Sequence, residues 1–239
     1  MKSEKATRGA TSLKPKEVER LLQTAKDKLG LADHALIFTA VRAGLREGET
    51  AALQWADVQF GEGEDDDDRY IVVQRNYDRR WPHKMLTPKS RKPQRVDLCR
   101  ELRHVLLQLR DERFVKAFAE GKSDISDELV FPSVAGTPIE MNNFSERVFK
   151  TLLSRAGLRK IRFHDLRHSY GSFLIQAGAS LAYIRDQMRH SSIQVTVDIY
   201  GHLIPGANLA LWTSWTHSSV RNTAATKDEA GIGAVQGSP

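Results

Sequence analysis

Residues 189–202 read RHSSIQVTVDIYGH, and this stretch does most to decide the kind of fold the chain adopts. A short helix through it places Val197 and Tyr200 on one face, which favours an aromatic side chain packed against a core. Gly201 favours a second interpretation, in which a phenol at the frayed end of the helix is exposed and mobile, with His190 ten residues before it. Because of Gly201, we expect the second interpretation.

A second polar stretch, residues 164–168, reads HDLRH. On a helix, the spacing of three puts His164 and Arg167 on the same side, so an imidazole and a guanidinium can bind one anion together. His164 and His168 are four apart and could instead hold a metal ion, which needs at least one further ligand. The chain has no HExxH motif and one cysteine, Cys99. We therefore expect no metal site and interpret His168 as a packed or hydrogen-bonded helix residue.

Arg46 lies at the start of a predicted short helix over residues 45–53. A guanidinium there adds its donors to the free backbone N–H groups of the first helical turn, and together they form a phosphate site. Taken alone, the pattern fits an arginine that caps a surface turn better. Arg46 supports a phosphate site only in combination with the other two stretches.

The composition indicates a globular protein with a basic surface. The chain has 239 residues, 40% of them hydrophobic, so it can bury one sizeable core. No apolar stretch reaches the ~18 residues that cross a bilayer, and the N-terminus lacks the apolar region of a secretory signal, so we expect a cytoplasmic protein. The formal charge is +6, and residues 75–110 carry eleven Lys or Arg against three acidic residues. Such a segment is typical of a solvated face or of a nucleic-acid contact.

The spacing of apolar residues predicts a mainly helical chain with a small antiparallel β-sheet, a mixed α+β fold. After a flexible leader over residues 1–12, we expect helices over residues 15–29, 32–43, 45–53, 101–119, 141–156, 164–177, 181–188 and 193–200. Gly44 is expected to end the second helix in a left-handed conformation. Strands are predicted over residues 55–60, 70–75, 84–87 and 94–98, with a cationic SRKP turn at 90–93. Residues 208–220 can form a last helix before a disordered tail.

Three segments resemble the signature boxes of the tyrosine recombinase, or phage integrase, family, in the same order and at similar separations. They read AGLREGE at residues 43–49, HDLRH at 164–168 and HSSIQVTVDIYGHL at 190–203. Residues 87–98, TPKSRKPQRVDL, are similar to the family's hairpin that carries a catalytic lysine. The resemblance covers residues 13–205 and implies a tyrosine recombinase catalytic domain.

The resemblance implies how a phosphate would be held. Arg46 and Arg167 would bind the non-bridging oxygens of the scissile phosphate, His190 would hydrogen-bond it, and Glu49 would support the first box. The phosphodiester gains negative charge in the transition state, which two arginines and an imidazole can stabilise without a metal. We therefore expect neither magnesium nor another cofactor.

The resemblance also implies that Tyr200 is the nucleophile. A phenol with a pKa of about 10 attacks poorly unless a neighbour removes its proton, and His164 would act as that general base or proton relay. The departing 5′ oxygen is strongly basic, and Lys89 on the hairpin would protonate it. Because the bond to tyrosine stores the energy of the broken linkage, rejoining needs no ATP.

Further basic residues are expected to contact DNA. Arg91 and Lys92 lie in the predicted hairpin turn, and Arg95 lies in the strand that follows it. Arg189 stands where the family usually has glycine, and a left-handed backbone there costs an arginine about 1 kcal/mol that glycine avoids. We hypothesise that Arg189 contacts the DNA backbone.

The resemblance implies double-stranded DNA with a recombination site as the partner, bound by four protomers, with a DNA-bending accessory protein as a further candidate. Residues 206–239 could dock on a neighbouring protomer, or Trp212 and Trp215 could cover the chain's own core. The family's N-terminal core-binding domain is absent from the chain, which predicts weak affinity and poor selectivity. The host would be a bacterium or a phage, with the protein at the nucleoid. A type IB topoisomerase and a catalytically idle DNA-binding regulator are the alternatives.

Overall fold

The computed structural model describes residues 12–78, 80, 85–86 and 92–203, without the side chains of residues 85, 86 and 202. The helices are α1 Pro15–Lys28, α2 Leu31–Arg42, α3 Glu47–Ala51, α4 Arg100–Ala119, α5 Met141–Phe144, α6 Lys150–Arg155, α7 Asp165–Gln176, α8 Leu181–Met188 and α9 Ile193–Tyr200. Shorter helical turns are η1 Trp55–Asp57, η2 Ser145–Phe149 and η3 Gly201–Leu203. The strands are β1 Val58–Gln59, β2 Tyr70–Val73, β3 Asn76–Tyr77, β4 Met85–Leu86 and β5 Gln94–Asp97. The expected leader and the expected C-terminal helix lie outside the described residues, apart from Ser12.

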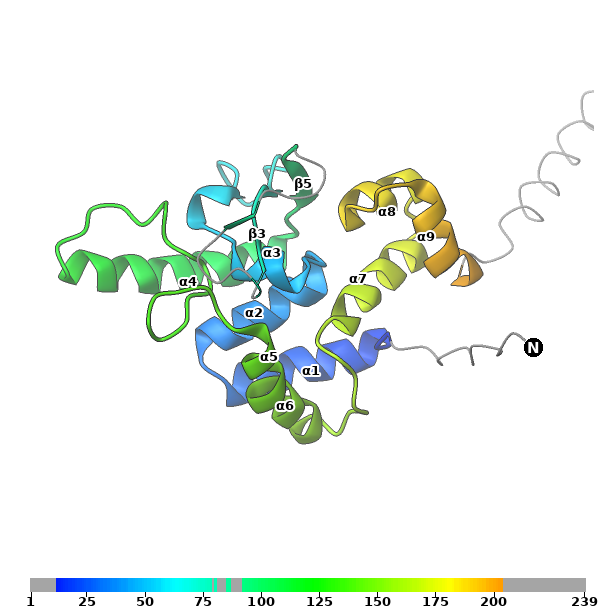
Figure 1. The fold of residues 1–239 in the computed structure, drawn as a ribbon, viewed down its shortest axis with the longest axis horizontal. Helices are drawn as coiled ribbons and strands as arrows, with labels where there is room; N and C mark the ends of the chain where they lie inside the picture. Colours follow the sequence, from blue (N-terminus) through cyan, green and yellow to red (C-terminus); the bar gives the residue numbers. More distant parts are fainter. Residues whose placement is uncertain (1–11, 79, 81–84, 87–91, 204–239) are drawn as a thin grey trace, which may run out of the picture. The chain divides into compact units, whose positions relative to one another are not determined.

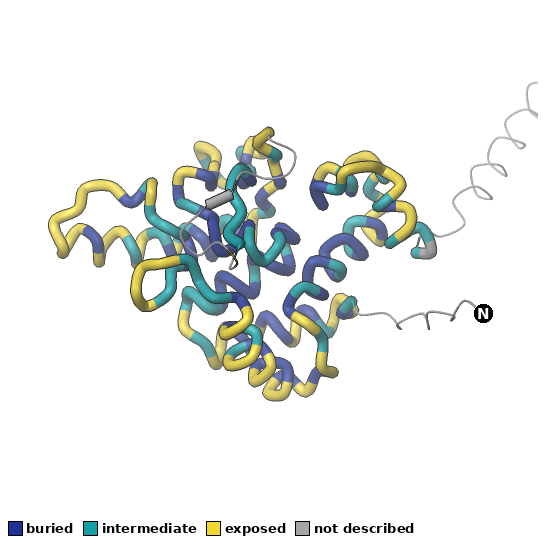
Figure 2. The backbone as a smooth tube through the Cα atoms, viewed as in Figure 1, coloured by how far each residue is buried: buried dark blue, intermediate teal, exposed yellow. Residues whose placement is uncertain are grey.

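Helix α2 lies at the centre of the fold, and α1, α4 and α7 pack around it (Figure 1). Seven of its twelve residues are buried, which is typical of a helix enclosed by protein on most sides. Figure 2 shows the buried residues concentrated along α2 and α7, with exposed residues toward the far end of α4. The central position of α2 fixes where its C-terminal turn, and the residues that follow it, are held.

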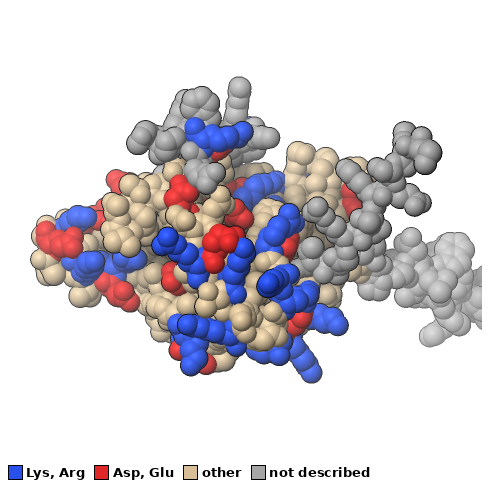
Figure 3. Space-filling view, turned by 60° about the horizontal axis from the view of Figure 1, so that its bottom comes forward, with Lys and Arg blue, Asp and Glu red and all other residues tan. Residues whose placement is uncertain are grey.

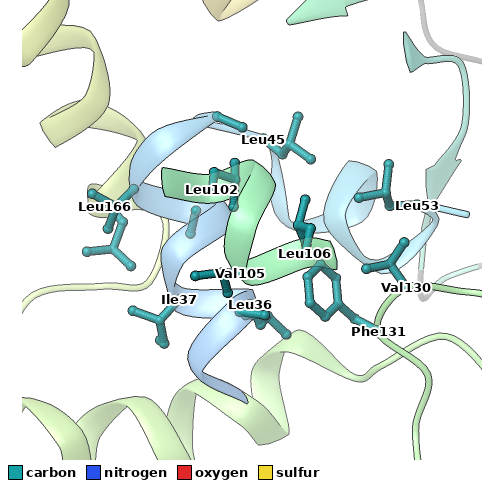
Figure 4. Packing of buried hydrophobic residues seen from close by; sticks show 14 of the residues in the cluster. Leu36, Ile37, Leu45, Leu53, Leu102, Val105, Leu106, Val130, Phe131 and Leu166 are labelled. Carbon is teal, nitrogen blue, oxygen red and sulfur yellow. The ribbon is translucent and has the colours of Figure 1, made fainter. Parts of the chain in front are cut away.

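The core between α2 and α4 is made of tightly packed aliphatic side chains (Figure 4). Leu36 of α2 and Leu102 and Leu106 of α4 are at most 1% exposed. Burying a side chain of this size stabilises the fold by about 1.5 to 3 kcal/mol. The apolar residues whose helical spacing predicted these segments are therefore the residues that pack in the core. The predicted mainly helical fold with a small antiparallel sheet is confirmed.

The sheet differs in detail from the prediction of four strands. Strands β1, β2 and β5 form a three-stranded antiparallel sheet, whereas β3 and β4 form a separate pair. The chain leaves the larger sheet at Gln74 and Arg75, whose side chains both donate to Oδ1 of Asp57, at 2.7 and 3.2 Å. This contact with a residue 17 positions earlier is tertiary, so no local strand pattern could reveal it.

Residues 141–156 were expected to form one regular helix, and the structure inserts the wider turn η2 between α5 and α6. Phe144 and Phe149 are five residues apart, which does not place them on one face of a regular α-helix. Both nevertheless pack edge-on against Phe163, with ring centroids 5.7 and 5.3 Å apart. The wider turn allows both rings to share one partner in the core.

None of the helices in the described part of the chain is long and apolar enough to cross a membrane.

Candidate active site

Hydrogen bonds join three segments that are far apart in the sequence. They are the α2–α3 turn, the first turn of α7 and the connection from α8 to α9. Arg167 on α7 joins them, because its guanidinium donates to the backbone oxygens of Gly44 and Met188. Arg167, in the second box, is thereby bonded to Gly44 of the first box and to Met188, which lies two residues before the third.

Arg46 is the residue that precedes α3, as the sequence predicted. Its backbone N–H donates to Oε2 of Glu49 at 2.8 Å, and its Nη1 donates to Oε1 of the same carboxylate at 2.7 Å. Nη2 donates to the backbone oxygen of Arg189 at 2.8 Å. The guanidinium is thus held on two sides, while 42% of the side chain stays exposed. Arg46 can therefore still receive an anion from solvent.

Arg167 is buried, with 4% of the residue exposed. Burial, followed by the charges of Arg189 and Arg46, lowers its pKa to about 9. The side chain therefore remains protonated at neutral pH, although desolvation and two neighbouring cations disfavour its charge. A bound anion would relieve both effects.

Gly44 has φ 54°, the left-handed conformation that the sequence predicted. A Cβ at this position would collide with the ring of Tyr170 on α7. The glycine therefore lets the α2–α3 turn approach α7 closely enough for its carbonyl oxygen to accept from Arg167. The spacing between the first two boxes depends on this one residue.

Arg189 requires a correction. Its backbone is left-handed, with φ 50°. Its guanidinium, however, turns inward: 1% of the side chain is exposed, and Nη2 pairs with Oε2 of Glu49 at 2.7 Å. Nη1 donates to the oxygen of Gln187 at 2.8 Å, and Nη2 also lies 3.1 Å from the oxygen of Gly44. A group enclosed in this way does not contact a DNA backbone in the described state.

The histidines are neutral hydrogen-bonding groups. His164 precedes α7, and its ring lies edge-on to that of His168, with centroids 5.4 Å apart. Nδ1 of His190 lies 2.9 Å from Oγ1 of Thr196. Burial, followed by the charges of three arginines, lowers the pKa of His190 to about 4. At neutral pH, His190 can thus donate one hydrogen bond and accept another without adding charge.

Tyr200 ends α9, and its ring is buried, with 2% of the residue exposed. The hydroxyl lies 3.2 Å from Nδ1 of His168, and the ring lies parallel to that of His190 at 6.4 Å. Burial raises the pKa of Tyr200 to about 12. Of the two interpretations, the packed aromatic is confirmed, and the exposed phenol is wrong for this state.

These contacts bring most of the predicted site residues into one neighbourhood. They are Arg46, Glu49, His164, Arg167, His190 and Tyr200. The comparison with known protein families agrees with the resemblance, since the model of the phage integrase family matches residues 11–205. The chain belongs to the phage integrase family.

Curated relatives in this family are about 30% identical to the chain over the aligned residues. A tyrosine recombinase XerC-like protein of Caldanaerobacter subterraneus is 30% identical over 179 residues, covering 72% of this chain and 46% of the relative. The ICEBs1 integrase of Bacillus subtilis is also 30% identical, over 180 residues, covering 70% of this chain and 44% of the relative. The chain thus spans about half the length of the curated relatives it matches.

Solved structures agree on the fold. The XerH site-specific recombinase bound to palindromic difH substrate matches with a TM-score of 0.65 at 20% identity, over 90% of this chain and 56% of XerH. The catalytic domain of bacteriophage HP1 integrase matches with a TM-score of 0.54 at 17% identity, over 81% of this chain and 88% of that domain. The chain has the fold of an integrase catalytic domain.

The predicted basic hairpin is described only in part. Lys89 and Arg91 lie outside the described residues, so the structure places neither of them. Lys92 is exposed. Arg95 is 65% exposed at its side chain, and its guanidinium lies 3.9 Å from the centre of the Tyr70 ring. The proposed DNA contacts of this hairpin remain predictions.

The metal alternative gains no support from the geometry. His164 and His168 do lie together, but no group of three or more His, Cys, Asp or Glu within the described ranges could hold a metal ion. His168 instead bonds the Tyr200 hydroxyl, so its interpretation as a hydrogen-bonded helix residue is confirmed. Its partner was missed, because the two residues are 32 positions apart.

A second basic segment also escaped the sequence analysis. Residues 147–162 contain six Lys or Arg and no acidic residue, and all six are exposed. The segment leads directly to His164. Figure 3 shows Lys and Arg side chains spread over the face that comes forward from the bottom of Figure 1, with fewer acidic side chains between them. A count of charged residues over positions 147–162 of the sequence would have identified the segment.

Proposed function

We propose that the chain is the catalytic domain of a site-specific recombinase, which cuts and rejoins DNA through a covalent bond between Tyr200 and a 3′ phosphate. The observation that carries the proposal is the pairing of Arg46 and Arg167. Their guanidiniums belong to one hydrogen-bond network, and Arg46 still reaches solvent. Two guanidiniums fixed relative to each other suit the non-bridging oxygens of one phosphodiester. Membership of the integrase family supports this activity.

The charge balance supports an anionic ligand. Three guanidiniums, those of Arg46, Arg167 and Arg189, lie around one carboxylate, that of Glu49. In this described cluster, three positive charges against one negative charge leave an excess of two. Keeping such an excess partly buried is unfavourable unless a counter-charge is added. A phosphodiester, whose single negative charge is shared by two non-bridging oxygens, would offset one of these two charges, and the transition state would gain further negative charge.

The proposed cleavage begins when the Tyr200 hydroxyl oxygen attacks phosphorus. The bond from phosphorus to the tyrosine oxygen forms, and the bond from phosphorus to the 5′ oxygen breaks. The phenol proton passes to an imidazole, either His164 or the contacting His168, and Lys89 protonates the 5′ oxygen. Attack by another 5′ hydroxyl reverses the sequence and rejoins a strand without ATP. The scheme uses no metal ion and no cofactor.

Tyr200 has to leave its buried position before it can attack. The described state is therefore assigned to the resting enzyme, in which the phenol lies against α7 and its pKa is about 12. An imidazole that accepts the proton during attack removes the need for prior ionisation. His168 is suited to this because burial lowers its pKa, which keeps the ring neutral.

The proposed partner is double-stranded DNA that contains a recombination site, of bacterial or phage origin. The exposed basic segment over residues 147–162 would contact its phosphates. Residues 13–205 form the proposed catalytic domain. We further propose that four protomers assemble on two sites and that residues 206–239 dock on a neighbouring protomer. A DNA-bending accessory protein and a separate second DNA-binding domain are the other proposed partners.

Covalent capture tests the proposed function. The protein is incubated with a library of duplexes that carry a randomised core and a nick, so that the short strand diffuses away after cleavage. A denaturing gel should show a DNA adduct for the wild type and none for Tyr200→Phe. Arg167→Gln should form at least about 100-fold less adduct, because the transition state loses one charged donor. Retarded DNA without any wild-type adduct would instead support the idle regulator.

A further inference from the structure

We propose that Arg189 is a positioning residue that holds both phosphate-binding arginines in register from inside the protein. The inference rests on the proposed function, and it concerns a residue that differs from the glycine usual in the family. Arg189 itself touches no substrate in this account. It acts on Arg46 through Glu49 and through its own backbone, and on Arg167 through Gly44.

The backbone of Arg189 is strained, which requires a compensating interaction. Among the residues that the structure describes, it is the one non-glycine with a positive φ, at 50°. Such a conformation persists in a residue with a side chain only where the surroundings over-determine it. Here the compensation is visible, since the guanidinium makes hydrogen bonds to Glu49, Gln187 and Gly44.

The contacts with Arg46 form a closed ring. The Glu49 carboxylate accepts from Arg46 through Oε1 and from Arg189 through Oε2, both at 2.7 Å. The ring closes where Nη2 of Arg46 donates to the backbone oxygen of Arg189 at 2.8 Å. The left-handed backbone allows both the side chain and the carbonyl of Arg189 to face this ring. Removing the side chain would take one donor from Oε2 of Glu49 and leave the carboxylate that positions Arg46 held by Arg46 alone.

The link to Arg167 runs through Gly44. Its carbonyl oxygen accepts from Nη1 of Arg167 and from Nη2 of Arg189, the latter at 3.1 Å. Arg167 also donates to the oxygen of Met188, the residue directly before Arg189. The two arginines therefore share one acceptor and one stretch of backbone. A shift of Arg189 is transmitted to both phosphate-binding guanidiniums.

The electrostatics agree with this geometry. Burial alone would raise the pKa of Glu49, but the charge of Arg189, followed by that of Arg46, lowers it to about 2. Glu49 thus stays ionised and keeps attracting Arg46. An uncharged residue at position 189 would leave a 5% exposed carboxylate with one cationic partner fewer.

The test compares Arg189→Gly and Arg189→Lys with the wild type, and uses Arg185→Gln on α8 as the matched control. Glycine suits the left-handed backbone, so Arg189→Gly should remain folded by circular dichroism. At saturating nicked DNA, we expect its cleavage rate constant to fall about 10- to 100-fold, because misplacement rather than lost binding is the defect. DNA affinity should change less than about two-fold, since most phosphate contacts lie elsewhere. Arg185→Gln should match the wild type.

Arg189→Lys separates charge from geometry. A lysine keeps the positive charge beside Glu49 but cannot fork to Gln187 and Gly44. We expect a rate constant between those of Arg189→Gly and the wild type. If Arg189→Gly cleaves at the wild-type rate while folded, or if both variants lose DNA affinity in proportion to rate, the inference is wrong.

A second readout does not depend on cleavage. Inorganic phosphate is titrated while the exposure of the site is followed by amide hydrogen exchange around residues 44–49. Positioning by Arg189 predicts phosphate affinity at least about ten-fold weaker in Arg189→Gly than in the wild type. A wild type that binds phosphate but forms no DNA adduct would overturn the proposed function alone. Equal phosphate affinity in both proteins would overturn the role of Arg189.

Discussion

At the scale of single residues, the site combines buried cations with neutral imidazoles. Arg167 keeps its proton at neutral pH, although its pKa is lowered to about 9. His190 lies near the same arginines, which together with burial lower its pKa to about 4. The residues that are proposed to bind the phosphate are thus charged, while those that are proposed to exchange hydrogen bonds or protons with it are not. This division suits a site that must hold a phosphate and move a proton at the same pH.

The low pKa of His190 predicts a pH-dependent stability. The folded state holds this imidazole neutral down to about pH 4, whereas the unfolded chain protonates it near its usual 6.5. Between these values the unfolded state binds more protons, so the stabilisation present above pH 6.5 is lost as pH falls. After allowance for solvent screening, the loss should be on the order of 1 kcal/mol. Urea unfolding of wild type and His190→Gln from pH 7 to 4.5 measures it.

The variant should lose less stability than the wild type over this range. Replacing the exposed His104 by Gln serves as the control and should leave the pH dependence of the wild type unchanged. If the free energy of unfolding falls equally with pH in the wild type and in His190→Gln, the low pKa assigned to His190 is wrong.

His168 offers a second prediction at this scale. It is the imidazole that contacts the Tyr200 hydroxyl, at 3.2 Å. If it takes the phenol proton, His168→Phe should slow covalent adduct formation about 100-fold while DNA binding is kept. Single-turnover rates for His168→Phe and His164→Phe would rank the two histidines. An unchanged rate for His168→Phe would leave His164 as the base.

At the scale of elements, α9 is held against α7 by a glycine. A Cβ built on Gly171 would lie 2.6 Å from both Cζ and the hydroxyl oxygen of Tyr200. The α7 surface at this point is therefore shaped to receive the phenol ring. Docking of α9 on Gly171 is what buries Tyr200, the proposed nucleophile.

Gly171→Ala should accordingly push Tyr200 out of its position. Overpacking of this kind costs about 1 to 3 kcal/mol, and here it should weaken the docking of α9. We expect amide hydrogen exchange in α9 to accelerate about ten-fold or more. Gly30→Ala is the control, since nothing lies within 4 Å of a Cβ at that position. Equal exchange in α9 for both variants would show that Gly171 does not set the buried state.

Element by element, the sequence analysis succeeded where contacts are local. Buried residues at helical spacing, such as Val18 and Leu21, produced correct helices because the same spacing packs them on a core. The strand predicted over residues 70–75 ends at Val73, because Gln74 and Arg75 turn toward Asp57. The inward turn of Arg189 was missed for the same reason, since Glu49 lies 140 positions earlier. The sequence predicted which residues gather at the site, whereas the burial of Arg189 and Tyr200 depends on tertiary contacts.

At the scale of the whole molecule, one exposed basic segment precedes a part of the site along the chain. The exposed basic segment of residues 147–162 precedes His164 directly. A protein that neutralises phosphates releases counter-ions, so its DNA affinity falls with salt in proportion to the number of contacts. Charge near the site should therefore affect this salt dependence, and charge elsewhere should not.

The double variant Arg155→Gln, Lys160→Gln tests this distribution. Both residues are exposed, and neither enters an ion pair with another residue of the described ranges. If each contacts one phosphate, the slope of log affinity against log salt should become shallower by about 1.8. Lys116→Gln is the control, near the end of α4 that lies on the opposite side of Figure 1 from α7. Fluorescence anisotropy over a salt series gives both slopes, and an unchanged slope for the double variant would place the DNA elsewhere.

The central claim is that Tyr200 becomes covalently bound to a phosphate held by Arg46 and Arg167. Tandem mass spectrometry of the trapped adduct, after nuclease and protease digestion, measures this directly. The account predicts one modified peptide that carries a nucleotide remnant on Tyr200. The double variant Arg46→Gln, Arg167→Gln should give no such peptide. A remnant on another residue, such as the 38% exposed Tyr183, would contradict the account.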